Sequence, residues 1–276
     1  MGYKTILVHI GQGKHSKNRL EYAIRLAKQY DAYLIGLYAF SLNIPPGYIM
    51  TRMKEEIEAE QNKIAVESMS RAKEDFLKQT SAAGLEKTEW HTTYDDADYA
   101  ISMRAQYADL VVIGQSDTAD DLSLPVDFPE RLVLTVARPV LILPNTDDFS
   151  TIGKRILVAW NASKEATRAV SNSIPLLMSA DSVYIMAVSS NTSEVDSIQS
   201  ENMVQYLKRH GVHAKVKDAH GVEIDVGNAL LSSASDFSAD LIVMGCYGHS
   251  RLREWVLGGA TRTILESMTV PVLMSH

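Results

Sequence analysis

The sequence predicts an α/β fold built from two tandem, doubly wound, Rossmann-like parallel-sheet domains. Short runs of valine, isoleucine and leucine alternate with amphipathic helical patterns, and the second half of the chain repeats the first. Strands that are apolar on both faces and separated by helices are typical of a parallel sheet covered by helices on both sides. Ligands of such folds bind beyond the carboxyl ends of the strands, so a site is expected in the loops that follow them.

Three segments recur in the same order and support the repeat. They are KTILV at 4–8 and KRILV at 154–158, ADLVVIG at 108–114 and ADLIVMG at 239–245, and the apolar stretches that follow Pro139 and Pro271. The offset between the copies falls from 150 to 131 residues, so the first copy holds about 19 extra residues, placed at about 42–63. A polar stretch with turn-forming residues at 144–153 joins the copies. We therefore predict domains at 1–146 and 152–276.

The first copy opens with a predicted strand at 6–8, followed by a helix whose apolar positions have the three-and-four spacing of an amphipathic helix. The segment from Gly11 to Ser16 between them is interpreted as a turn with Ser16 as the helix N-cap, and a phosphate-binding loop is the alternative. A strand at 33–38 comes next. The extra residues contain Pro45-Pro46-Gly47, which breaks regular structure, and then a long helical pattern from about 51 to 80.

The second copy repeats this order without the extra residues. A strand is predicted at 156–159, Ser163 is the expected N-cap of the next helix, and further strands are predicted at 183–188 and 241–244. Its last strand follows Pro271. Each copy therefore contains the strands and helices of one doubly wound domain.

Composition narrows the classes of function. The chain has 276 residues, 46% of them hydrophobic, and a net charge of −7, which argues against a general nucleic-acid binder with a basic face. The single cysteine, Cys246, excludes an intramolecular disulfide and a multi-cysteine metal site. No apolar run approaches the ~20 residues that span a bilayer, and the N-terminus does not resemble a signal peptide. A cytoplasmic protein without membrane insertion is expected.

The strongest chemical motif lies in the second copy, directly after the strand at 241–244. It consists of Gly245-Cys-Tyr-Gly248, nine further residues, and Gly258-Gly259 at the start of a helix. Glycines let successive backbone N–H groups point toward a bound anion, and a helix N-terminus attracts negative charge. The pattern therefore favours a polyphosphate site, although glycines that only form tight strand-to-helix turns are the alternative.

This glycine pattern on a repeated α/β domain resembles the universal stress protein family in its tandem form, and the resemblance covers essentially the whole chain. Nucleotide-binding members of that family hold ATP with the glycine loop around the phosphates. The resemblance implies an adenine-nucleotide α-hydrolase-like fold and a pseudo-dimer within one chain, joined through the last strands at 140–143 and 272–274. By position it implies a nucleoside end at Ala159, Trp160 and Asn161, adenine contact at the Val188 backbone, and phosphate or ribose contacts at Met244, Gly245, Gly248, Gly258, Gly259, Ala260 and Thr261. Apart from the resemblance, His249 is a candidate contact for phosphates or a partner, because it directly follows Gly248.

The two copies depart from the family pattern to different degrees. In the second copy Asn161 replaces the usual aspartate and Gly259 the usual serine or threonine, which removes a charge and a hydroxyl but keeps a backbone N–H. Losing one neutral hydrogen bond costs only ~0.5–1.5 kcal/mol, so ATP binding is still expected there. In the first copy, residues 114–117 lack the second glycine, aspartates follow, and the later glycine pair is absent. We expect no family-type ATP site in that copy.

The favoured function is therefore a stress-related, ATP-binding regulatory or protective protein whose second copy holds the nucleotide, with or without Mg²⁺. One alternative is an ATP-independent protein-interaction module with an apolar ligand in the first copy, beneath a lid formed by Tyr48, Ile49, Met50 and Met53. Another is ATP hydrolysis or self-phosphorylation. Hydrolysis would be slow, because the sequence contains no recognisable nucleophile–base pair. A homodimer or a protein partner is compatible with each. Cys246 is interpreted as a buried structural residue, with a redox-sensing thiol as the alternative.

Overall fold

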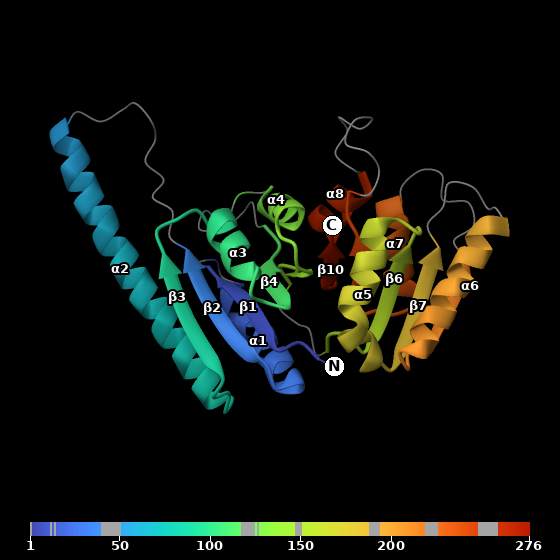
Figure 1. Ribbon diagram of the computed structural model, residues 1–276. Helices are drawn as coiled ribbons and strands as arrows, with labels where there is room; N and C mark the ends of the chain where they lie inside the picture. Colours follow the sequence, from blue (N-terminus) through green and yellow to red (C-terminus); the bar gives the residue numbers. More distant parts are fainter. Residues whose placement is uncertain are drawn as a thin grey trace. The chain divides into compact units, whose positions relative to one another are not determined.

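The structure is a computed structural model that describes residues 2–11, 13, 15–39, 51–116, 125, 127–146, 151–187, 194–218, 226–247 and 259–276. The chain forms two compact units. One contains Tyr3–Val112 with Asp117–Pro125, and the other contains Ile113–Ser116 with Val126–His276 and the first two residues. Each unit has a sheet with helices packed against it, as Figure 1 shows.

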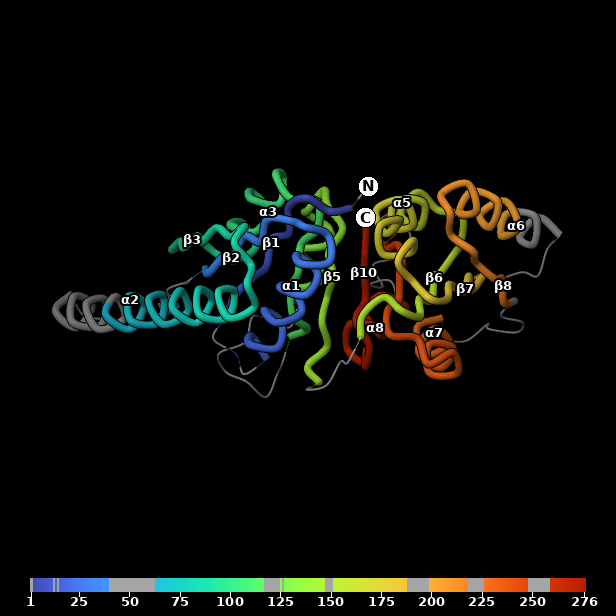
Figure 2. Tube along the Cα trace, turned by 90° about the horizontal axis from the view of Figure 1, so that it is seen from below, coloured from blue at the N-terminus to red at the C-terminus, as the bar shows by residue number. Residues whose placement is uncertain are grey.

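The first unit has a parallel sheet in the order β3-β2-β1-β4. Its strands are β1 (Thr5–Ile10), β2 (Tyr33–Ala39), β3 (Thr88–Thr93) and β4 (Leu110–Gly114), and its helices are α1 (Ser16–Tyr30), α2 (Thr51–Ala82) and α3 (Ala97–Ala105). Figure 2 shows α1 and α2 on one face of this sheet and α3 on the other. This is the doubly wound arrangement that the sequence predicts.

The second unit has the strand order β5-β10-β9-β6-β7-β8. Its strands are β5 (Val140–Leu143), β6 (Arg155–Trp160), β7 (Ser182–Ala187), β8 (Ala214–Asp218), β9 (Leu241–Gly245) and β10 (Val272–Ser275). Its helices are α4 (Phe128–Thr135), α5 (Lys164–Met178), α6 (Glu194–Arg209), α7 (Val226–Asp236) and α8 (Gly259–Ser267). In Figure 2, α5 and α6 lie on one face of the sheet and α7 and α8 on the other.

One strand pair in the second unit joins the two sequence repeats. β5, the last strand of the first repeat, pairs antiparallel with β10, the last strand of the second, with Leu141 opposite Leu273. The other pairs that we describe in this unit are parallel. The pairing of the two final strands that the resemblance implied is therefore confirmed. It also explains why residues 126–146 group with the second unit, and the domain bounds 1–146 and 152–276 stay a prediction.

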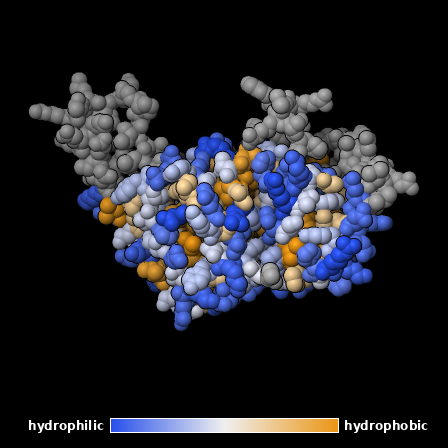
Figure 3. All heavy atoms as spheres, viewed as in Figure 1, coloured by the Kyte–Doolittle hydropathy of each residue, from blue (hydrophilic) through white to orange (hydrophobic). Residues whose placement is uncertain are grey.

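The first strand of each repeat lies inside its sheet and forms part of the core. Ile6, Leu7 and Val8 in β1 and the corresponding residues 156–158 in β6 are fully buried. Helices on both faces of the sheets account for this burial, as the continuous apolar runs predict. The visible face in Figure 3 is mainly hydrophilic, with scattered hydrophobic residues. In the described part of the chain, every helix is too short or too polar to span a lipid bilayer.

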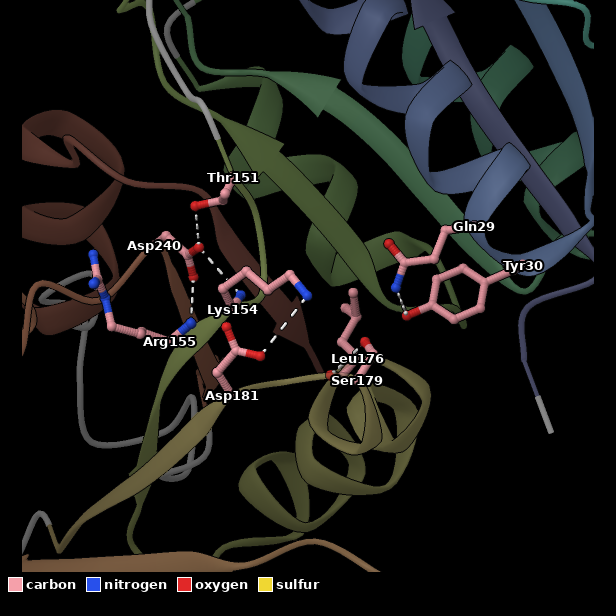
Figure 4. Close-up of polar contacts among 9 residues, drawn as sticks. All are labelled: Gln29, Tyr30, Thr151, Lys154, Arg155, Leu176, Ser179, Asp181 and Asp240. Atoms are coloured by element: carbon pink, nitrogen blue, oxygen red, sulfur yellow. Dashed lines mark hydrogen bonds and ion pairs between the residues drawn. The ribbon is translucent and has the colours of Figure 1, made fainter.

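Corresponding aspartates fix the amino-terminal end of the first strand in each repeat. The Asp240 carboxylate accepts hydrogen bonds from the backbone N–H groups of Lys154 at 3.1 Å and Arg155 at 2.8 Å, and from the Thr151 hydroxyl at 2.6 Å (Figure 4). In the first repeat, Asp109 accepts from the backbone N–H groups of residues 4 and 5 at 2.7 and 3.0 Å. These bonds lie at the opposite end of the strands from the loops where ligands of such folds bind.

The long helix of the first repeat runs from Thr51 to Ala82, close to the predicted 51–80. Its Phe76 is fully buried and lies 5.1 Å from the ring of Trp90 in β3. Gly36 in β2 makes this packing possible, because a Cβ there would lie 2.7 Å from the Phe76 ring. The predicted lid residues, Tyr48, Ile49, Met50 and the side chain of Met53, lie outside the described part of the chain.

The two serines that were expected to cap helices differ in role. Ser163 is the N-cap of α5, and its Oγ accepts a hydrogen bond from the Ala166 N–H at 3.1 Å, as predicted. The prediction for Ser16 was wrong, because His15 occupies the N-cap position and Ser16 is the first residue of α1. The Ser16 hydroxyl instead accepts from the backbone N–H of Gly11 at 3.1 Å, which closes the turn after β1.

Candidate functional site

The carboxyl ends of β6 and β9 bring together the two stretches that the sequence singled out. These strands are neighbours and parallel, with Val158 opposite Val243. Ala159 and Trp160 therefore end one strand, directly before Asn161, beside Met244 and Gly245, which end the other. Ala159 and Trp160 are buried, Asn161 is exposed, and the site lies at the edge of the sheet expected for a doubly wound fold.

Gly245 has a packing role that the glycine pattern alone does not reveal. A Cβ at this position would lie 2.4 Å from the backbone nitrogen of Ala166 and 2.5 Å from the carbonyl carbon of Glu165. Both atoms belong to the first turn of α5, so the end of β9 contacts the start of this helix directly. Only glycine allows an approach this close.

The loop between β6 and α5 is held by local hydrogen bonds. The Asn161 side-chain oxygen accepts from the Ser163 N–H at 3.2 Å, and Ala162 has a φ of 56°, in the left-handed region. Asn161 thus forms a short side-chain-to-backbone turn. Its amide group remains exposed at the end of β6.

The buried polar atoms near this edge include two, at the end of β6 and the start of α5, that have no hydrogen-bond partner among the residues that the structure describes. They are Nε1 of Trp160, a donor, and Oε2 of Glu165, an acceptor, and both side chains are 8% exposed. Buried polar groups are normally hydrogen-bonded, so such atoms are candidates for contact with a ligand. Glu165 is not among the site residues predicted from the sequence, although its place directly before buried Ala166 puts it on the inner face of α5.

Cys246 follows Gly245 and has the properties of a structural residue. It is buried, its N–H donates to the Ser275 carbonyl at 3.0 Å, and its Sγ lies 3.3 Å from the same oxygen. Burial, and then the nearby charge of Glu165, raise the pKa of the Cys246 thiol to about 12. The thiolate needed for redox chemistry is therefore disfavoured, which supports the buried-residue interpretation over a redox sensor.

Helix α8 supplies the other half of the candidate site. It begins at Gly259, where a Cβ would meet nothing within 4 Å, and its first turn contains no acidic residue. Its position is fixed by α7, because a Cβ at Gly227 would lie 2.6 Å from Cβ of Thr263. Thr261 is buried, whereas Gly259 is exposed. Among the described residues, nothing therefore blocks the positive end of the helix dipole, which attracts anions.

Four predicted site residues lie outside the described part of the chain. They are Val188, Gly248, His249 and Gly258. Their contacts with adenine and phosphates stay predictions.

In the first repeat, the turn that follows β4 corresponds to the turn after β9 and has a structural role. Gln115 follows β4 as Cys246 follows β9, and its N–H donates to the Leu143 carbonyl at 2.7 Å. Its side-chain nitrogen donates to the Leu265 carbonyl at 2.7 Å, near the end of α8, and its side-chain oxygen accepts from the Asn145 N–H at 3.1 Å. Where the second repeat has a glycine loop, the first therefore has a side chain that caps α8.

Comparison with known proteins identifies the class of protein that these features define. A model of the universal stress protein family matches residues 2–144 and, a second time, residues 153–276. The chain therefore belongs to the universal stress protein family and contains its domain twice, in tandem.

Solved structures have the same fold, and one curated protein is similar in sequence over part of the chain. A universal stress protein from Archaeoglobus fulgidus is 17% identical, covers 98% of this chain and 95% of its own, and has a TM-score of 0.70. One from Pseudomonas aeruginosa is 15% identical, covers 99% and 93%, and has a TM-score of 0.59. Universal stress protein Slr1230 from Synechocystis is 28% identical over 149 residues, which are 52% of this chain and 49% of that protein. The chain thus matches about half the length of this curated relative.

Proposed function

We propose that the second repeat binds ATP and that the protein is a cytoplasmic, stress-related regulatory or protective protein. The observation that carries this proposal is the N-terminus of α8 at Gly259, where a Cβ would meet no described residue within 4 Å and where the first turn has no acidic residue. It belongs to the glycine pattern that begins at Gly245, beside the end of β6. A helix N-terminus with free backbone N–H groups is a general binding site for phosphate.

The surrounding residues suit the parts of a nucleotide. Backbone N–H groups from Gly259 to Thr261 would hold phosphate oxygens, and exposed Asn161 would meet the nucleoside. The unpartnered Nε1 of Trp160 offers one further donor. Glu165 contributes a buried negative charge, so Mg²⁺ bound to the phosphates would reduce repulsion between ligand and site. Binding of ATP would make the state of the protein depend on the ATP concentration in the cell.

Calorimetric titration of the full chain with ATP, with and without Mg²⁺, tests this proposal after removal of any co-purified nucleotide. We expect one nucleotide per chain. Two per chain would contradict our interpretation of the first repeat, and no binding would reject the ATP proposal.

A matched pair of variants places the nucleotide. Gly259→Glu puts a carboxylate where the phosphates are expected, in a space that has nothing within 4 Å, whereas Gly259→Gln has nearly the same shape without the charge. Repulsion between like charges should weaken ATP binding by ~10-fold or more in the Glu variant relative to the Gln variant. Equal affinities would mean that ATP binds elsewhere.

A second function, as an ATP-independent interaction module, is favoured by one surface feature. Tyr99, Met103 and Tyr107 lie four residues apart, along and just beyond α3, and are 58%, 47% and 80% exposed. Exposed apolar rows of this kind are typical of protein-binding helix faces. If a second copy covers this row, Met103→Lys should dissociate the dimer in sedimentation experiments without changing ATP affinity.

Slow ATP hydrolysis remains a separate proposal for the same site. It requires ADP release in proportion to protein, and this release should be lost in Gly259→Glu and retained in Gly259→Gln. Equal ADP release from both variants would assign the activity to a contaminant.

A further inference from the structure

The first repeat carries a guanidinium group at the carboxyl end of β1. Arg19 lies in the second turn of α1, is partly buried, and donates through Nε to the His9 carbonyl at 2.7 Å. Gly11 leaves the room that the group occupies, because a Cβ there would lie 3.3 Å from Nη2 of Arg19. The bond to His9 uses Nε, and both Nη groups have no hydrogen bond or ion pair with the residues that the structure describes.

The positive charge of Arg19 is uncompensated within the described residues. No carboxylate among them forms an ion pair with it, and the first turn of α1 contains no acidic residue. Burial lowers the pKa of Arg19 to about 10, and no carboxylate raises it again. His9, which is buried beside it, has its pKa lowered to about 3 by burial and by the charge of Arg19, so it is neutral at pH 7. Of these two residues, Arg19 therefore carries the positive charge and His9 does not.

A second source of positive potential lies in the same loop. Helix α1 has 15 residues and begins at Ser16, so the positive end of its dipole faces the turn after β1. Ser16 accepts a hydrogen bond from Gly11 and keeps its own hydroxyl proton for donation. The Ser16 hydroxyl and the Arg19 guanidinium thus lie within a few residues of the helix N-terminus.

The fold itself does not require an arginine here. Counted from the first residue of each helix, Ser16 in α1 and Lys164 in α5, Arg19 corresponds to Thr167, which is exposed and uncharged. An unpaired, desolvated charge is costly, and apolar replacements of such charges are often neutral or stabilising. A guanidinium retained at this cost indicates a partner that the described residues do not provide.

We propose that the first repeat binds a small phosphate-type oxyanion at the Nη groups of Arg19, beside Gly11 and Ser16. A planar guanidinium donates two parallel hydrogen bonds to such an oxyanion, and the helix N-terminus adds to the attraction. The site differs from the proposed ATP site in repeat, in strand and in chemistry, because it relies on a side-chain cation rather than on a glycine loop. It does not depend on ATP binding by the second repeat.

Inorganic phosphate is the probe for this site. The full chain carrying Gly259→Glu, which disables the α8 N-terminus, is titrated with phosphate at constant ionic strength while the amide resonances of Gly11 and Gly13 are followed by NMR. We expect a saturable shift of both resonances. Arg19→Met should weaken the affinity by about tenfold or more, Arg19→Lys by less, and the control Arg25→Met should leave it unchanged. Arg25 lies on the same helix in an exposed ion pair with Glu21.

Thermal unfolding separates a binding role of Arg19 from a structural one. If Arg19 is kept for an anion, Arg19→Met should unfold in phosphate-free buffer at the same temperature as the parent or higher, and should lose the rise that phosphate causes. The proposal is overturned if the Gly11 resonance does not shift, or if phosphate shifts it equally in parent, Arg19→Met and Arg19→Lys. It also fails if both Arg19 variants unfold earlier by the same amount with and without phosphate, because Arg19 would then be paired within the chain.

Discussion

Substitution of Gly245 by alanine tests whether the end of β9 and the start of α5 are packed as closely as the structure indicates. The new Cβ would lie 2.4 Å from the Ala166 nitrogen and 2.5 Å from the Glu165 carbonyl carbon. Both are backbone atoms, and the Ser163 cap holds this turn in place, so no side-chain rotation relieves the contact. One of the two elements must move by about 1 Å to restore an ordinary separation near 3.5 Å.

The cost of that movement can be estimated. Overpacking of a core by one methyl group typically costs ~1–3 kcal/mol, and a clash with backbone on both sides belongs at the upper end. We expect Gly245→Ala to lower the free energy of unfolding by ~3 kcal/mol, which corresponds to roughly 6–12 °C in midpoint temperature at ~2–4 °C per kcal/mol.

Urea unfolding, followed by far-UV circular dichroism and by tryptophan fluorescence, measures the effect. Gly259→Ala is the matched control, because its Cβ meets nothing within 4 Å and alanine favours a helix. That variant should equal the parent or exceed it by up to ~1 kcal/mol. If both variants unfold at the same urea concentration as the parent, the close contact between β9 and α5 does not exist.

Two further predictions concern pH and the aspartates that hold the first strands. The pKa of buried His9 is about 3 in the folded chain against an ordinary 6.5, so the unfolded chain takes up the proton first. Stability should therefore fall as pH drops from 6.5 toward 3, by at most about 5 kcal/mol, and His9→Asn should flatten this fall in urea titrations at several pH values. An unchanged acid dependence would assign it to other groups. Asp240→Asn should cost ~1–3 kcal/mol by weakening the bonds to Lys154 and Arg155, while exposed Asp181→Asn, whose ion pair with Lys154 spans 3.9 Å, should stay within ~0.5 kcal/mol of the parent. Equal losses in the two aspartate variants would contradict this assignment.

Much of the fold could be predicted because its strongest signals are local. Buried strands such as Leu241–Gly245 are continuous apolar runs, and the repeat of those runs revealed two copies of one domain. Ser163 was predicted correctly because its hydroxyl bonds three residues along the same helix. The role of Ser16 was predicted wrongly, because its hydroxyl oxygen accepts a hydrogen bond from the Gly11 N–H and not from the helix. The helix also begins at Ser16 itself, one residue earlier than a Ser16 cap would require.

The features that were missed depend on contacts distant in sequence. Gln115 reaches the end of α8, 150 residues further along, and no local pattern marks it. Glu165 and Arg19 interrupt apolar helix faces, and periodicity alone assigns such residues to the surface. Their burial follows from strands and loops that pack against α5 and α1. The residues implied around the nucleotide remain predictions that rest on resemblance.

The pairing of β5 with β10 inside one polypeptide has a consequence for divergence. In a dimer of identical chains, every substitution appears on both sides of the symmetry axis, so a loop cannot be altered in one subunit and preserved in the other. Here the equivalent positions are encoded separately. Gln115 caps a helix while Cys246 stays buried beside a glycine loop, although both follow equivalent strands. Covalent linkage thus allows an asymmetric molecule in which one half can keep an ancestral ligand while the other acquires a new one.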